Sequence, residues 1–122
     1  MALVKWAHFQ KIKLIHIPNE GKRSLTEGYN LKKMGLSPGF MDLFLPEARG
    51  GYFGLFLEMK QNRPYATHET KTKTWINQKN WIDELNKQGY FASFCFGWEQ
   101  GMNLIQQYCR FGRTLIQREL YG

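Results

Sequence analysis

Hydrophobic and polar positions divide the first third of the chain into a short helix, a short strand and a long polar stretch. Residues 1–10 place apolar side chains on one side of about two helical turns. Residues 13–17 are β-prone, and Pro18 ends this run because proline lacks a backbone donor. From 19 to 40 the chain is polar, glycine-containing and basic, which favours a loop with room for one helical turn.

Two apolar runs in the middle of the chain predict a β-hairpin. Residues 41–45 form the first predicted strand, which Pro46 ends, and residues 52–60 form the second. The intervening Arg49-Gly50-Gly51 is typical of a turn. The second run is almost continuously apolar, so we expect burial on both faces of a sheet.

The second half alternates helical and extended patterns after a polar loop at residues 61–73. Thr74 can cap a helix that reaches about Lys87, and Gly89 ends it. A buried strand at residues 90–96 and a helix at residues 98–111 follow. The order helix, strand, strand, strand, helix, strand, helix predicts an α/β fold, a mixed β-sheet flanked by helices.

Composition adds a size and a charge to this picture. With 122 residues and 43% hydrophobic content, the chain is expected to form one domain over residues 1–122. It carries 17 Lys and Arg against 10 Asp and Glu, a net charge of +7. This excess favours a polyanionic partner such as nucleic acid, although a lysine-rich solvated surface has the same composition.

Cysteine usage and hydropathy exclude several classes of protein. Cys95 and Cys109 lie in apolar surroundings without Cys-x-x-Cys spacing, so we expect buried free thiols rather than zinc ligands or a disulfide. No apolar run is long enough for a membrane span, and no charged-then-apolar leader opens the sequence. A cytoplasmic location is the default expectation.

The candidate chemistry lies at one end of the predicted hairpin. Asp42 starts the first strand, and Glu58-Met59-Lys60 ends the second, so antiparallel pairing brings Asp42 close to Glu58. Glu58 and Lys60 share one face because side chains at i and i+2 do. Two carboxylates beside an ammonium suit metal-assisted attack of water on a phosphodiester.

Taken alone, this pattern has a second interpretation. A glutamate and a lysine at a strand end are often a solvated cross-strand pair. The apolar context argues for the chemical interpretation, since charges gathered at the end of a buried hairpin are costly unless an ion or a partner offsets them.

Several ordered motifs resemble one known family. The chain is similar, over about residues 2 to 110, to the virus-type replication-repair nuclease (VRR-NUC) domain of the PD-(D/E)XK superfamily, and it resembles the free-standing phage type. The resemblance implies a restriction-endonuclease-like core, with helices on both sides of a mixed sheet, and a bacterial host cytoplasm if the chain is phage-encoded. The segments that carry it are residues 16–24, 31–39, 41–46, 54–60, 78–81 and 89–90.

The resemblance also implies roles for individual residues. Asp42 and Glu58 look like the metal-binding carboxylates, and the Met59 carbonyl is similar to the backbone ligand of such sites. Lys60 resembles the catalytic lysine, which positions the water or neutralises charge on the phosphate. Gln78 resembles the family's site-facing glutamine; its alternative is an ordinary polar residue near the start of a helix.

The chain departs from the family pattern in two places. Met41 stands where the family has the proline before its aspartate, a change that affects only the stiffness of the approach. Family members also carry an acidic residue on a longer first helix, whereas no acid precedes Glu20 here. Either Glu20 supplies a third carboxylate or a substrate contact, or it is a turn residue paired with Lys22 or Arg23 and the metal binds more weakly.

The implied function is a Mg²⁺- or Mn²⁺-dependent DNA endonuclease. No sequence-reading motif is present, and free-standing relatives are homodimers that cut branched DNA such as Holliday junctions, so structure-selective cleavage is expected. The alternatives are a nucleic-acid-binding module that keeps the fold without catalysis, and a structural or protein-interaction domain. Candidate phosphate contacts, each equally compatible with a solvated surface, are Lys22, Arg23, Lys32, Lys33, Lys71 and Lys73. Four aromatic residues on or after the last helix are candidates for a dimer interface or equally for the core, and the core is favoured for Trp98. They are Trp98, Tyr108, Phe111 and Tyr121.

Overall fold

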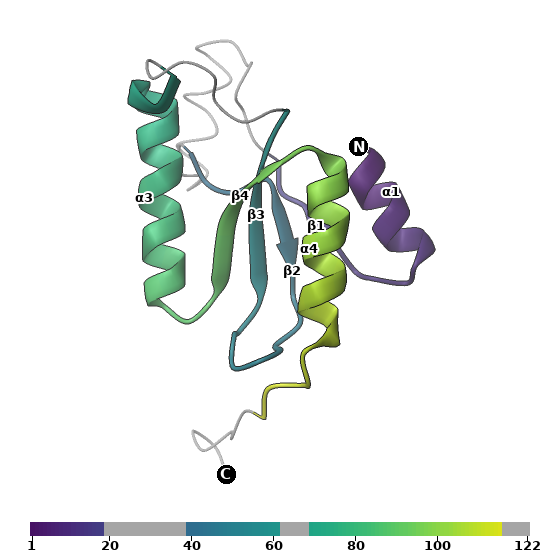
Figure 1. Cartoon of the computed structure of the whole chain (residues 1–122). Helices are drawn as coiled ribbons and strands as arrows, with labels where there is room; N and C mark the ends of the chain where they lie inside the picture. The colour runs from purple at the N-terminus through teal and green to yellow at the C-terminus, as the bar shows by residue number, and fades with distance from the viewer. Residues whose placement is uncertain (19–38, 62–68, 116–122) are drawn as a thin grey trace.

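One mixed β-sheet lies at the centre of the protein (Figure 1). The computed structural model describes residues 1–18, 39–61 and 69–115. The strand order is β1-β2-β3-β4; the first two pairings are antiparallel and the third, β3 with β4, is parallel. The strands are β1 (Ile15–His16), β2 (Leu43–Leu45), β3 (Leu55–Lys60) and β4 (Phe91–Phe96).

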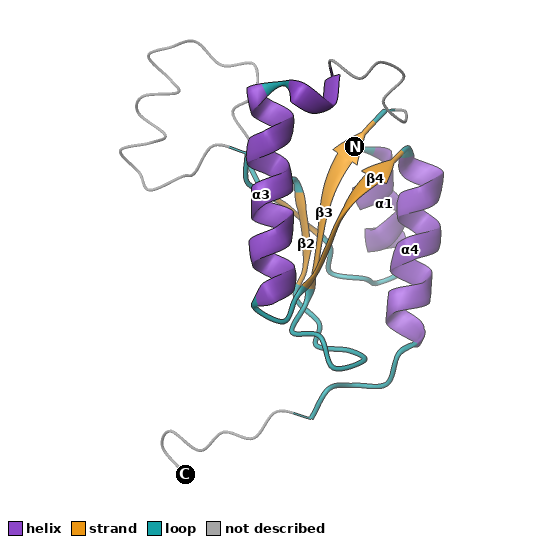
Figure 2. Ribbon diagram, turned by 60° about the vertical axis from the view of Figure 1, so that its left-hand side comes forward, coloured by secondary structure: helices purple, strands orange, loops and turns teal. Residues whose placement is uncertain are grey.

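Helices cover both faces of this sheet, as Figure 2 shows. Helices α1 (Ala2–Phe9) and α4 (Trp98–Arg110) pack on one face, and α3 (Lys73–Lys87) packs on the other after the short 3-10 helix η1 (Glu69–Lys71). The predicted α/β fold, a mixed sheet flanked by helices, is therefore confirmed. The longest helix among the described residues has 15 residues, and none is both long and apolar enough to cross a bilayer.

Strand β3 is buried from both sides, as its continuous apolar run predicts. Leu55 and Leu57 belong to the hydrophobic core shared with α1 and α4, whereas Phe56 belongs to the core under α3. Since side chains alternate between the faces of a strand, Glu58 and Lys60 continue the α3 side. The alternation thus places both polar residues beneath a helix.

The β2–β3 hairpin closes at the far end of the sheet from these residues. Arg49 and Tyr52 exchange two backbone hydrogen bonds of 3.1 and 2.8 Å around Gly50 and Gly51, which have φ values of 60° and 89°. Two consecutive positive φ angles define the turn type that matches the twist of a hairpin. The turn predicted at Arg49-Gly50-Gly51 is confirmed.

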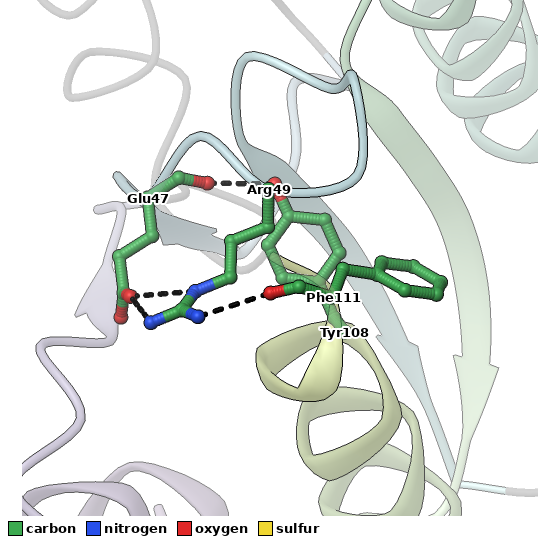
Figure 3. A network of polar contacts seen from close by, with 4 residues as sticks. All are labelled: Glu47, Arg49, Tyr108 and Phe111. Atoms are coloured by element: carbon green, nitrogen blue, oxygen red, sulfur yellow. Dashed lines mark hydrogen bonds and ion pairs between the residues drawn. The ribbon is translucent and has the colours of Figure 1, made fainter. Parts of the chain in front are cut away.

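A polar network ties the hairpin to the end of α4 (Figure 3). The Arg49 guanidinium donates to Glu47 Oε1 at 2.8 and 3.0 Å and to the Phe111 carbonyl at 3.0 Å. Tyr108, which is buried, donates its hydroxyl to the Glu47 carbonyl at 2.6 Å. The network fixes the turn, and so supports the register that aligns β2 with β3.

Three sequence-based expectations about individual residues need correction. Thr72, not Thr74, caps α3: its Oγ1 accepts from the Trp75 amide at 3.2 Å, and the helix begins at Lys73. Trp98 is not core, since 48% of it is exposed on the first turn of α4. Both cysteines are free as expected, but Cys109 is only half-buried.

The other boundaries shift by a few residues. Strands β2 and β3 are shorter than their apolar runs, because only residues 43–45 and 55–57 pair continuously, and the turn adds a single isolated bridge between Arg49 and Tyr52. Most of the loop expected at 19–40, and much of that at 61–73, lies outside the described residues.

Alanine substitutions at Gly50 and Gly51 test the turn. Both replacements force a side chain into a positive-φ conformation, at a cost of roughly 1–2 kcal/mol. Only at Gly50 would the new Cβ also lie 2.8 Å from the Phe111 ring, whereas nothing lies within 4 Å at Gly51. We expect Gly50→Ala to lose about 1 kcal/mol more unfolding free energy than Gly51→Ala in urea denaturation. Equal losses would contradict the packing of Phe111 on the turn.

Candidate active site

Asp42 is fixed from three sides at the start of β2. Its backbone amide donates to the Leu57 carbonyl at 3.1 Å, and its carbonyl accepts from the Ile17 amide at 2.7 Å. Its side-chain Oδ2 accepts from the Met59 amide at 2.9 Å. The predicted meeting of Asp42 with the end of the neighbouring strand is therefore observed, and the carboxylate has little freedom to turn away.

The segment before Asp42 is seated on α3 by Gly39. This glycine has a φ of 77°, and a Cβ there would lie 2.8 Å from the Asn77 Cβ and 3.1 Å from the Gln78 amide nitrogen. The next residue, Phe40, packs edge-on against Trp81 with ring centroids 5.0 Å apart. The close approach that only glycine permits thus brings β2 and the first half of α3 together.

Gln78 bridges the two charged residues of β3. Its Nε2 donates to Glu58 Oε2 at 3.0 Å, and its Oε1 accepts from Lys60 Nζ at 2.6 Å. The amide is buried, with only 6% of the residue exposed. The structure therefore brings together Asp42, Glu58, Lys60 and Gln78, all of them named from the sequence.

Glu58 is a carboxyl group in an unfavourable environment. Only 3% of the residue is exposed, and its Oε1 has no hydrogen-bond partner among the described residues. Burial raises the pKa of Glu58 to about 9; the adjacent Asp42 carboxyl adds to this increase and Lys60 opposes it. Such a carboxyl is neutralised either by a proton or by a cation.

The oxygens at this point fit a hard divalent cation. The Asp42 and Glu58 carboxyl groups are neighbours, since hydrogen bonding and charge from Asp42 both contribute to the raised pKa of Glu58. The Met59 amide points towards β2, where it bonds Asp42. The amide and the carbonyl of one strand residue point to the same side, so the Met59 carbonyl also points towards β2. Mg²⁺ takes one or two carboxylates and completes its shell with water and phosphate oxygens. Among the described residues no third His, Cys, Asp or Glu joins this pair.

Two aromatic residues that sequence analysis did not assign to the site lie beside Lys60. Lys60 Nζ is 5.2 Å from the centroid of Trp75 and 5.7 Å from that of Phe94. Trp75 has helical spacing with Trp81, Ile82 and Leu85, which is typical of a core-facing helix side. Its position three residues before Gln78, on the same side of a helix, is the signal that links it to the site.

The remaining predicted residues fall into two groups. Lys71, which ends η1, and Lys73, which begins the Gln78-bearing helix α3, are both exposed. The other predicted contacts lie outside the described residues: Glu20, Lys22, Arg23, Lys32 and Lys33.

The raised pKa of Glu58 predicts a pH-dependent stability in the presence of EDTA. Between pH 4.5 and about 9 the folded chain holds a proton on Glu58 that the unfolded chain releases. Rising pH therefore favours unfolding across this window, and Glu58→Gln removes that dependence. Urea denaturation of wild type and variant at several pH values measures the difference. Glu84→Gln, an exposed acid on α3, serves as the control. A wild-type curve parallel to that of Glu58→Gln would contradict the burial of an ionisable carboxyl.

Comparison with known proteins connects this geometry to a family. No protein-family model matches the sequence, and no curated protein matches it. A solved structure described as "VRR_NUC domain protein" superposes with a TM-score of 0.71 and is 32% identical to this chain. The match covers 92% of this chain and 85% of that one. The fold and the resemblance noted in the sequence agree with this neighbour: the chain belongs to the VRR-NUC family of nuclease domains.

Proposed function

We propose that this nuclease-domain protein is a metal-dependent endonuclease that hydrolyses phosphodiester bonds of branched DNA. The observation that carries the proposal is the buried Glu58 Oε1, which has no hydrogen-bond partner among the described residues and lies beside a second carboxyl group. Two carboxyl groups this close, one of them buried, can both be ionised only when a cation offsets their charge. A cation offsets both carboxylates.

Asp42 and Glu58, with the Met59 carbonyl, would hold the cation. A bound Mg²⁺ or Mn²⁺ supplies positive charge to the phosphate and lowers the pKa of a coordinated water. The protein's own contribution is rigidity: the Met59 amide holds Asp42 Oδ2, and Gln78 holds Glu58 Oε2. One oxygen of each carboxyl group is therefore fixed in place by the protein.

Lys60 supplies the positive side chain of the site. Its ammonium donates to Gln78 Oε1 at 2.6 Å. The charge is therefore kept near Glu58, although Lys60 and Glu58, both described residues, form no ion pair within 4 Å. An ammonium in this position can orient a water molecule or neutralise charge that develops on a phosphate oxygen. Gln78 is thus a positioning residue for both Glu58 and Lys60.

The charge of the chain supports a DNA substrate bound through its phosphates. The net charge is +7, and Lys71 and Lys73 are exposed at the end of η1 and the start of α3, the helix that carries Gln78. Contacts of this type give affinity without reading sequence, so we infer selection by DNA shape. We further propose a homodimer, in which two sites related by symmetry cut the two strands of a four-way junction. Trp98 and Phe111, which are 48% and 44% exposed, are the aromatic candidates for its interface.

A second candidate function is DNA binding without catalysis. The observation in its favour is that the first turn of α1 holds no acidic residue and that no third acid joins Asp42 and Glu58 within the described residues. Weak metal binding would follow from this donor set. The experiment below separates the two functions.

One cleavage assay tests the proposal. Purified protein is incubated with a four-way junction, a flap or a linear duplex in Mg²⁺, Mn²⁺ or EDTA. We expect products only with metal, most rapidly from the junction, and a loss of at least about 100-fold with Glu58→Gln while junction binding persists. Light scattering of the same samples measures whether the chain is a dimer.

The matched control is Glu84→Gln, which removes an exposed acid from α3 and leaves the site intact. It should cut at the wild-type rate. Undiminished cleavage in EDTA contradicts the metal-dependent mechanism. Junction binding without cleavage under every metal supports the binding module instead.

A further inference from the structure

Two stacked aromatic rings adjoin the ammonium of Lys60. Trp75 and Phe94 lie with centroids 4.3 Å apart and an interplanar angle of 23°. Lys60 Nζ is placed over both rings, at 5.2 and 5.7 Å from their centroids. An ammonium at these distances is attracted by the negative face of an aromatic ring, most strongly by tryptophan.

The fold brings the two rings to this place from different elements. Trp75 lies one turn before Gln78 on α3, so both side chains lie on the same side of the helix. Phe94 is the register partner of Glu58 in the parallel β3–β4 pair, so it lies on the same face of the sheet. Thr72 caps α3 by accepting from the Trp75 amide, which fixes the first turn of the helix, where the tryptophan lies.

The Lys60 ammonium could instead form an ion pair with Glu58, and the two rings favour the position that it occupies. Lys60 lies on the same strand face as Glu58, and a flexible lysine next to a buried carboxylate would ordinarily close onto it as an ion pair. Within the described part of the chain the ion pairs are Arg49–Glu47 and Lys79–Asp83, and neither includes Lys60. The ammonium is instead held by Gln78 Oε1 and the two ring faces.

We propose that Trp75 and Phe94 are positioning residues for Lys60. Their ring faces hold the ammonium away from the Glu58 carboxylate, which leaves Glu58 Oε1 to the cation and Lys60 to the phosphate or the water. The catalytic part of this inference rests on the proposed nuclease function. The placement of the ammonium does not, so it can be measured separately.

Nuclear magnetic resonance tests the placement directly. In protein carrying ¹³C-labelled lysine, ring currents should move the Lys60 ε-CH₂ signal upfield of the other lysines, and Lys60→Arg assigns it by its loss. Trp75→Leu should return the signal to the position of the exposed lysines. Trp75→Phe, which keeps an aromatic face, should leave much of the displacement in place.

Cleavage kinetics on the four-way junction test the consequence. We expect Trp75→Leu to lower kcat by about three- to tenfold with little change in KM, and Trp75→Phe to stay within about twofold of wild type. The matched control is Trp6→Leu, which removes a partly buried tryptophan from α1, on the other face of the sheet. It should move neither the Lys60 signal nor kcat, and thermal unfolding shows that each variant is folded.

The outcomes separate this inference from the proposed function. An undisplaced Lys60 signal in the wild type, or one that Trp75→Leu leaves in place, overturns the placement whatever the activity. A signal that moves while kcat stays constant overturns the positioning role. If the wild type cuts no DNA, the nuclease proposal fails, and the signal still decides whether the rings hold the ammonium.

Discussion

The hydrogen-bonded chain from Glu58 through Gln78 to Lys60 is the interaction on which the site depends. It joins a strand to the helix that covers it, and it places a carboxyl group and an ammonium at fixed positions without pairing them directly. Both ends of a buried amide are satisfied, so this part of the site is stable as it stands. The remaining buried oxygen, Glu58 Oε1, is not satisfied within the described residues, and the chemistry of the site follows from this imbalance.

The rest of the fold supports the hydrogen bonds that join Glu58, Gln78 and Lys60. The Gly50-Gly51 turn and the Arg49 network set the register of β2 against β3 at one end of the sheet, and that register delivers Asp42 to Met59 at the other. Gly39 lets the segment before Asp42 approach α3 closely enough to share its surface with Gln78. The residues that fix the turn and the residues that form the site therefore lie at opposite ends of one hairpin.

Much of this arrangement could be predicted from the sequence because it depends on local rules. Alternation along β3 predicts that Glu58 and Lys60 share a face, and antiparallel pairing predicts that Asp42 meets them. Contacts that depend on the packing of α3 could not be predicted in this way. The choice of Thr72 over Thr74 as cap, and the stacking of Trp75 on Phe94, depend on where the helix lies against the sheet. Gln78 was assigned through the family resemblance, and helical periodicity alone gives it no role.

The account has one central claim: Asp42 and Glu58 form a single cation site. Calorimetric titration of Mn²⁺ into the wild type, Asp42→Asn, Glu58→Gln and the double variant tests it most directly. The account predicts a single site per chain that either substitution alone weakens as strongly as both together, because each carboxylate acts only with the other. Independent, additive losses, or binding that survives in either single variant, would contradict it.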